Sequence, residues 1–164
     1  MKPKEVVLNA SPLICLSKSG LSGLLPGLFE HIVVPGAVVD ELLTKGSADT
    51  EIESLLSQHW LQHIRDLSMH PVVASWDLGK GESEVLSYAF EQTGYWAILD
   101  DLAARRCAAS IGCGYTGTVG IIVLAKKSGI VKSVRESLYR LQDAGLWLSK
   151  SFIQKVSESF DDVT

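Results

Sequence analysis

The sequence predicts an α/β fold of three layers, α/β/α, with helices on both faces of a central parallel sheet. Short apolar runs rich in β-branched residues alternate along the 164 residues with longer amphipathic stretches, and this alternation is typical of a parallel sheet. The short runs lack alternating polar residues, which indicates strands buried on both faces. Apolar residues make up 46% of the chain and charged residues 21%, so we expect a globular protein, and residues 1–164 suit a single domain.

Two strands and three helices are expected in the first part of the chain. In order they are a strand at 6–8, a helix at 12–19, a strand at 32–34, a helix from Pro35 to a break at Gly46-Ser47, and a helix at 48–57. Ser11 precedes proline and is expected to be the N-cap of the first helix, because serine caps helices well and proline suits a first helical position. Residues 59–67 fit either a strand or an extended loop.

The second part of the chain continues the alternation. It is expected to hold a turn at 79–81, a helix to 92, a strand at 95–99, a helix to 111, a glycine-rich connection at 112–117, and helices at 118–127, 133–144 and 149–159. Gly94 ends a helix, and Asp100-Asp101 caps the next one. Ser133 with Glu136 forms a capping box.

The charges are unevenly distributed along the chain. The net charge of −4 argues against a protein that simply coats nucleic acid. Residues 1–100 hold 6 basic and 13 acidic side chains, whereas residues 101–164 hold 9 basic and 6 acidic. An acidic site that binds cations beside a rim that binds phosphates would fit this distribution. Two ordinary solvated faces are the alternative.

The three cysteines are too few for a disulfide framework and are expected to be reduced core thiols, which favours a cytoplasmic protein. Lys2, Lys4 and Glu5 interrupt any signal-peptide run, and no apolar stretch is long enough to span a membrane. We therefore expect no membrane association.

Polar residues follow two of the expected strands. Asn9 comes directly after the strand at 6–8, and Asp100-Asp101 comes directly after the strand at 95–99. Ligands of parallel sheets bind beyond the carboxyl ends of the strands, so these side chains are candidates for a site. The alternative is that they only cap helices.

Two helical glutamates could join these strand-end residues. Glu82 shares a helix face with Leu86 and Ala89, and Glu41 follows Val38 by three residues. Each could instead lie at the edge of an apolar stripe with its carboxylate in solvent. If all these side chains converge, the clustered carboxylates require a cation, and oxygen ligands without His or Cys select Mg²⁺ or Mn²⁺.

Five segments resemble, in order, the sequence motifs of PIN domains, and the match covers about residues 5–160. They are VLNASPLI at 7–14, PGAVVDEL at 35–42, LGKGESE at 78–84, ILDDLAAR at 98–105 and GTVGII at 117–122. The resemblance is greatest to prokaryotic PIN domains similar to the toxins of VapBC-type toxin–antitoxin pairs. It implies a metal-dependent ribonuclease, an RNA substrate, a homodimer and a small antitoxin protein as partner.

The resemblance also implies roles for individual residues. The metal site and catalytic set would comprise Asn9, Glu41, Glu82, Asp100 and Asp101. Asp101 is favoured over Asp100 as the direct ligand. Ser11 and Thr118 would place hydroxyls near the metal or the scissile phosphate. Arg105 and Lys126 are candidates for phosphate contacts, with solvated helix charges as the alternative.

Asn9 departs from the PIN pattern, which has aspartate at this position. A neutral amide oxygen removes one negative charge, so metal affinity and water activation are expected to weaken. The chain is therefore expected to be either an impaired ribonuclease or a catalytically weak PIN module that binds RNA or a partner protein.

Residues 112–117 match the dinucleotide pattern G-x-G-x-x-G, which would favour a nucleotide-binding protein. That fingerprint should follow the first strand of a βαβ unit, whereas residues 102–111 are expected to be helical. A connecting turn is the preferred interpretation.

Overall fold

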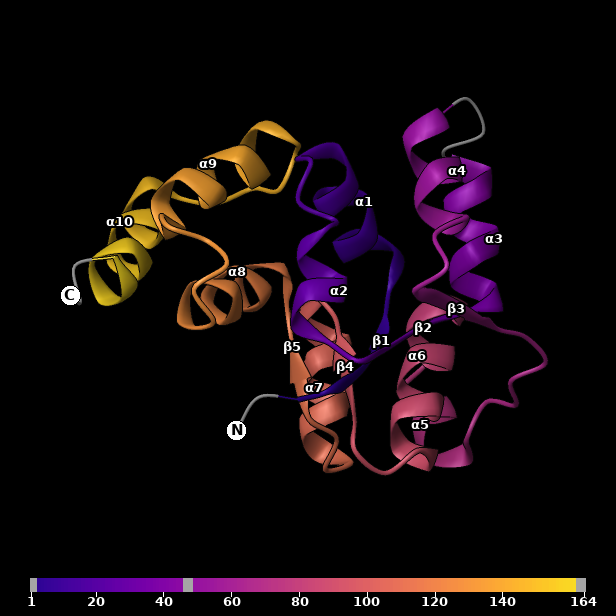
Figure 1. The fold of residues 1–164 in the computed structure, drawn as a ribbon. Coiled ribbons are helices and arrows are strands. Elements are labelled where there is room, and N and C mark those ends of the chain that lie inside the picture. Colours follow the sequence, from indigo (N-terminus) through magenta and orange to yellow (C-terminus); the bar gives the residue numbers. More distant parts are fainter. Residues whose placement is uncertain (1–2, 46–48, 162–164) are drawn as a thin grey trace.

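The structure is a computed structural model that describes residues 3–45 and 49–161. Its centre is a five-stranded sheet, which lies between the helices in Figure 1. The strands are β1 (Glu5–Leu8), β2 (His31–Pro35), β3 (Leu61–Ile64), β4 (Tyr95–Ile98) and β5 (Tyr115–Thr116). Their order is β3-β2-β1-β4-β5, and every neighbouring pair is parallel. The predicted parallel sheet is confirmed.

Helices cover both faces of this sheet. They are α1 (Ala10–Lys18), α2 (Leu24–Leu28), α3 (Gly36–Lys45), α4 (Thr50–Leu56), α5 (Pro71–Ala74), α6 (Lys80–Glu91), α7 (Leu102–Ser110), α8 (Thr118–Lys127), α9 (Val134–Asp143) and α10 (Lys150–Phe160). In Figure 1, α1, α3 and α4 lie on one side of the sheet, and α5, α6 and α7 lie on the other. The three-layer α/β/α architecture is therefore confirmed. None of the helices in the described part of the chain combines the length and the apolar character of a membrane-spanning segment.

Strands are added on one side of β1 first and on its other side afterwards. From β1 the chain moves outward through β2 to β3, and it then returns to place β4 on the other side of β1. Leu8 is in register with Ile98, and the Asn9 amide donates a hydrogen bond of 3.2 Å to the Ile98 carbonyl. The carboxyl ends of β1 and β4 thus lie together at a topological switch point, where open parallel sheets bind their ligands.

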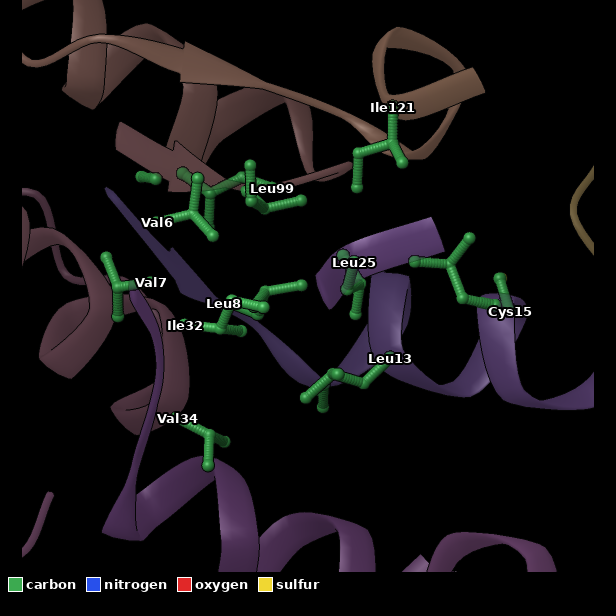
Figure 2. Close-up of a cluster of buried hydrophobic side chains, with 14 of the residues drawn as sticks. Val6, Val7, Leu8, Leu13, Cys15, Leu25, Ile32, Val34, Leu99 and Ile121 are labelled. Atoms are coloured by element: carbon green, nitrogen blue, oxygen red, sulfur yellow. The ribbon is translucent and has the colours of Figure 1, made fainter. Parts of the chain in front are cut away.

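The core lies between the sheet and the helices. Figure 2 shows Leu8 and Ile32 of the sheet in the same cluster as Leu13 of α1 and Leu25 of α2. These four side chains are 0–2% exposed, and burial of each contributes roughly 2 kcal/mol to folding. The last three residues of β1 are fully buried, as expected of a strand covered on both faces.

Three short elements were not predicted. The five residues of α2 include Pro26 and Gly27, and α5 spans four residues, so neither is long enough to show a helical pattern. The two-residue strand β5 lies inside the glycine-rich connection. The ambiguous segment 59–67 contains strand β3. The predicted break at Gly46-Ser47 lies outside the described residues, because residues 46–48 are not described.

The predicted caps have a mixed outcome. Asp101 and Ser133 cap α7 and α9 with side-chain hydrogen bonds, as predicted. The prediction that Ser11 caps the first helix is wrong, because α1 already begins at Ala10 with Asn9 as its N-cap residue. The side chain of Asn9 makes no capping hydrogen bond, so it is available for another purpose.

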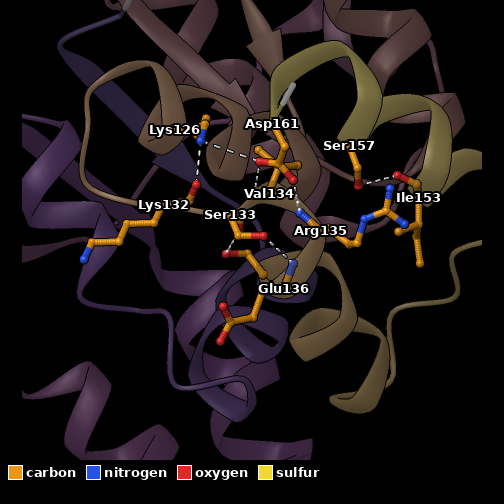
Figure 3. A network of polar contacts seen from close by, with 10 residues as sticks. Lys126, Lys132, Ser133, Val134, Arg135, Glu136, Ile153, Ser157 and Asp161 are labelled. Atoms are coloured by element: carbon orange, nitrogen blue, oxygen red, sulfur yellow. Dashed lines mark hydrogen bonds and ion pairs between the residues drawn. The ribbon is translucent and has the colours of Figure 1, made fainter. Parts of the chain in front are cut away.

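The carboxylate of Asp161 joins the end of α10 to the start of α9 (Figure 3). It accepts hydrogen bonds from the amides of Val134 at 2.7 Å and Arg135 at 2.9 Å, and Lys126 Nζ lies 3.7 Å away. Partial burial opposes ionisation of Asp161, but these amide hydrogen bonds and the Lys126 charge together hold its pKa below the usual value. Asp161 therefore satisfies two of the unpaired amides of the α9 N-terminus.

Asp161→Ala is expected to lower the free energy of unfolding by about 1 kcal/mol at neutral pH, the usual loss for removing a helix cap. Because the folded pKa is lowered, the difference from the wild-type protein should shrink as the pH falls below about 4. Urea unfolding measures both effects. The control is Asp143→Ala, which removes an equal charge from the other end of α9. Equal losses in the two variants would contradict this role.

Candidate active site

One cavity of about 470 Å³ brings together all five residues of the predicted metal site. Its lining comprises Asn9, Ala10, Ser11, Ile14, Cys15, Glu41, Lys45, Glu82, Asp100 and Asp101. Asn9 follows β1 and Asp100 follows β4, so the cavity opens at the switch point of the sheet. Glu41 reaches it from α3 and Glu82 from α6.

Asn9 is the most deeply buried of the five, with 5% of its surface exposed. Among the described residues, its Oδ1 atom is the buried side-chain oxygen that lacks a hydrogen-bond partner. An unsatisfied buried amide oxygen costs about 1–3 kcal/mol, so native proteins rarely leave one without a reason. This oxygen is a potential metal ligand, and a cation in the cavity would supply the partner that it lacks among the described residues.

The absent side chain of Gly81 lets α6 approach Asn9 and Glu41 closely. A Cβ atom on Gly81 would lie 3.3 Å from Asn9 Oδ1 and 3.3 Å from Glu41 Oε2. The two oxygens therefore flank the same small volume beside the first turn of α6. The Glu82 carboxylate lies against Gly79, the N-cap of that helix, where the helix dipole favours negative charge.

Asp100 is fixed by Thr118 at the start of α8. Its Oδ1 accepts a hydrogen bond from the Thr118 amide at 2.8 Å, and its Oδ2 accepts one from the Thr118 hydroxyl at 2.5 Å. Gly117 permits this contact, because a Cβ atom there would lie 2.8 Å from Asp100 Oδ1. Thr118 is fully buried, so this pair ties α8 to the carboxyl end of β4.

Asp101 is held less fully than Asp100. Its Oδ2 accepts a hydrogen bond from the Ala104 amide at 2.9 Å, and within the described residues its Oδ1 makes no hydrogen bond. One Asp101 oxygen is thus available to a cation, whereas both Asp100 oxygens already have a partner. These contacts favour Asp101 as the direct ligand, which stays a prediction.

Lys45 also lines the cavity, and the sequence analysis missed it. Its Nζ lies 2.8 Å from Glu41 Oε1, four residues earlier on α3. The pKa of Lys45 is raised, mainly by this hydrogen bond and the charge of Glu41, with a smaller effect of the Glu82 charge. The spacing of four helical residues between Glu41 and Lys45 was the signal that could have found it.

The remaining predicted residues are placed differently. Ser11 lines the cavity next to Cys15, whose pKa is raised mainly by burial and further by the Asp100 charge. Arg105 stacks over the ring of Tyr115 at 5.4 Å, outside the cavity lining. Lys126 donates a hydrogen bond to the Lys132 carbonyl and pairs with Asp161 (Figure 3), and these contacts favour a structural role for it rather than a phosphate contact.

The glycine-rich segment at 112–117 leads from α7 to α8 and contains β5. It follows a helix, so it lacks the strand-to-helix context that a dinucleotide fingerprint requires. Gly112 has a φ of 77°, which suits glycine at the end of a helix. This segment is a connecting turn, as the sequence analysis preferred.

The oxygen atoms of the cavity are of the type that a hard divalent cation binds, but their present positions are not those of a metal site. All candidate ligands are oxygens, and among the described residues the buried Asn9 Oδ1 has no hydrogen-bond partner that a cation would displace. Within the described residues, however, no three or more His, Cys, Asp or Glu side chains are close enough to hold a metal ion as they stand. Lys45 and Thr118 hold two of the carboxylates instead, so the carboxylates would have to turn toward a cation.

The chain belongs to the PIN domain family, whose model matches residues 5–162. The matched region contains every residue of the cavity lining. PIN domains are generally nucleases, so the fold and the family define a domain of the nuclease type. A search of curated proteins found no match to this chain.

Thr118→Val is expected to lower the free energy of unfolding by about 2 kcal/mol, because it leaves a part-buried carboxylate oxygen of Asp100 without the hydroxyl donor of the fully buried Thr118. Urea unfolding measures the loss. Thr44→Val is the matched control, since the exposed Thr44 hydroxyl donates to the Asp40 carbonyl on the same helix. If Thr118→Val were as stable as Thr44→Val, the Asp100–Thr118 pair would not anchor α8.

Proposed function

We propose that this PIN domain hydrolyses phosphodiester bonds of RNA with the help of Mg²⁺ or Mn²⁺. The observation that carries the proposal is the convergence of Asn9, Glu41, Glu82, Asp100 and Asp101 on one cavity at the switch point of the sheet. A group of four carboxylates is unfavourable unless a cation offsets the repulsion. A nuclease site that uses hard divalent cations explains why they are gathered there.

The side chains in and around the cavity would have different roles. Asn9, Glu41, Glu82 and Asp101 would hold the ion, with Asp100 beside them. A bound Mg²⁺ or Mn²⁺ supplies water activation and stabilises the oxygens of an in-line phosphoryl displacement. Thr118 keeps Asp100 in a fixed position through two hydrogen bonds. The Ser11 hydroxyl at the cavity wall would donate a hydrogen bond to a phosphate oxygen.

Arg105 lies near Asp100, outside the cavity lining. A Cβ atom on Gly117 would lie 2.8 Å from Asp100 Oδ1 and 3.7 Å from Arg105 Nη1, so the guanidinium is close to Asp100. Its stacking on Tyr115 holds it there. Arg105 is therefore proposed as a phosphate contact at the edge of the cavity, and the contacts of Lys126 do not support that role for Lys126.

Asn9 favours a second candidate function, a PIN module that binds RNA or a partner protein with little or no cleavage. The amide lowers the negative charge of the cavity by one relative to aspartate. Metal affinity and activation of water both fall with that charge. The two candidates share one binding cavity and differ in whether its charge suffices for catalysis.

Asn9→Asp is expected to tighten Mn²⁺ binding about tenfold, because a full charge replaces a neutral oxygen within reach of a divalent ion. Without metal the buried carboxylate should lower the melting temperature below that of the wild-type protein, and saturating Mn²⁺ should recover it. Titration calorimetry and thermal unfolding with and without EDTA measure these effects. Equal metal affinity in the two proteins would contradict the placement of Asn9 among the ligands.

Cleavage of a labelled structured RNA distinguishes the two candidate functions. Asn9→Asp is expected to cut RNA with Mn²⁺ or Mg²⁺ at least about tenfold faster than the wild-type protein, and EDTA should abolish cutting. The double variant Asn9→Asp, Glu82→Gln should lose this activity, because it removes a carboxylate of the cavity. Absence of cutting by every form, across several RNAs, would exclude the nuclease and favour the binding module.

The toxin-like role, with a homodimer and a small antitoxin, is likewise proposed from the resemblance. Its structural support is a set of exposed aromatic residues at the C-terminal helices. Trp147, between α9 and α10, is 84% exposed, and Tyr139 and Phe152 on these helices are also exposed. Large exposed aromatic side chains are common at protein interfaces.

A further inference from the structure

Lys45 is the positive charge inside an acidic cavity. Among the described residues that line the cavity, it alone is basic, and the carboxylates of Glu41, Glu82, Asp100 and Asp101 line the same cavity. Its Nζ is hydrogen-bonded to Glu41 Oε1 at 2.8 Å. The chain therefore provides one cation of its own where the proposed function requires a divalent one.

Glu41 has one carboxylate oxygen beside Lys45 and the other near Asn9. Its Oε1 is occupied by Lys45, whereas its Oε2 borders the volume beside Gly81 that Asn9 Oδ1 also borders. Asn9 is 95% buried, and among the described residues its Oδ1 has no hydrogen-bond partner. A divalent ion that satisfies Asn9 would use Glu41 and would meet the ammonium on the other oxygen of the same carboxylate.

The pair is close but easily separated. The Lys45 side chain is 64% exposed and that of Glu41 is 37% exposed. Ion pairs at such exposed positions make a modest, though measurable, contribution to stability, because water screens them and two long side chains lose freedom. The Lys45 ammonium can therefore leave Glu41 when another cation binds, so it does not close the cavity to a divalent ion permanently.

We propose that Lys45 is a built-in counter-cation that competes with the divalent ion for Glu41. In the absence of metal it offsets the repulsion among the carboxylates and stabilises the cavity. When metal binds, the ammonium is displaced from Glu41, so Lys45 raises the metal concentration that the site requires. This inference rests on the proposed function, since it assumes that the cavity binds Mg²⁺ or Mn²⁺.

The test is a Mn²⁺ titration of Lys45→Met and of the wild-type protein. The electron paramagnetic resonance signal of free Mn²⁺ measures how much of the ion is bound. Methionine keeps much of the length of lysine without its charge. Removal of a positive charge a few ångströms from a divalent ion is expected to tighten binding about tenfold. Lys155→Met is the control, because it makes the same charge change on α10 at an exposed position, outside the cavity lining.

A second readout does not depend on the affinity measurement. Without metal, Lys45→Met should melt at a lower temperature than the wild-type protein, because the carboxylates lose their counter-cation. Saturating Mn²⁺ should raise the melting temperature of Lys45→Met more than that of the wild-type protein. Lys155→Met should follow the wild-type protein in both conditions.

The outcomes separate this inference from the proposed function. If the wild-type protein binds Mn²⁺ and Lys45→Met binds it equally or more weakly, the competition is refuted while the metal-dependent nuclease stands. Weaker RNA binding by Lys45→Met with unchanged Mn²⁺ affinity would make Lys45 a phosphate contact and would also refute it. If neither protein binds Mn²⁺, the metal-dependent function and the inference both fail.

Discussion

The parallel pairing of β1 with β4 is the interaction on which the candidate site depends. It brings the end of the first strand, Asn9, beside the end of the fourth, Asp100, although the two residues are far apart in the sequence. The same pairing creates the topological switch point, because the connections after β1 and β4 lead to opposite sides of the sheet order. Helices α3 and α6 then need only one glutamate each to complete the acidic cavity. The close approach of α6 at Gly81 sets how near those carboxylates come to Asn9.

Contacts within the chain lower the repulsion among the carboxylates of the cavity. Thr118 holds both oxygens of Asp100, Lys45 neutralises Glu41, and the Ala104 amide binds one oxygen of Asp101. Each contact stabilises the protein without metal by satisfying a carboxylate. Asn9 also lowers the repulsion, because its amide is neutral, although among the described residues its buried Oδ1 has no hydrogen-bond partner. These contacts and the neutral amide of Asn9 therefore lower the electrostatic repulsion within the cavity.

Much of this arrangement could be predicted from the sequence, because strand ends and helix faces follow from local patterns. The parallel sheet and the convergence of Asn9, Glu41, Glu82, Asp100 and Asp101 were anticipated and are seen in the structure. Contacts between distant segments were not anticipated. No local sequence pattern indicates that Asp161 forms an ion pair with Lys126 or that Thr118 donates a hydrogen bond to Asp100. The first helix also began earlier than the Ser-Pro pair indicated, because the backbone enters it directly from β1. The single domain over residues 1–164 stays a prediction.

The most direct test of the central claim is a crystal structure of the wild-type protein soaked in Mn²⁺, with anomalous diffraction to locate the ion. The account predicts an anomalous peak in the cavity, with Asn9 Oδ1 and an oxygen of Glu41 or Asp101 among its ligands and the Lys45 ammonium moved away from Glu41. A cavity without such a peak at saturating Mn²⁺, or an ion bound elsewhere while Lys45 stays on Glu41, would contradict it.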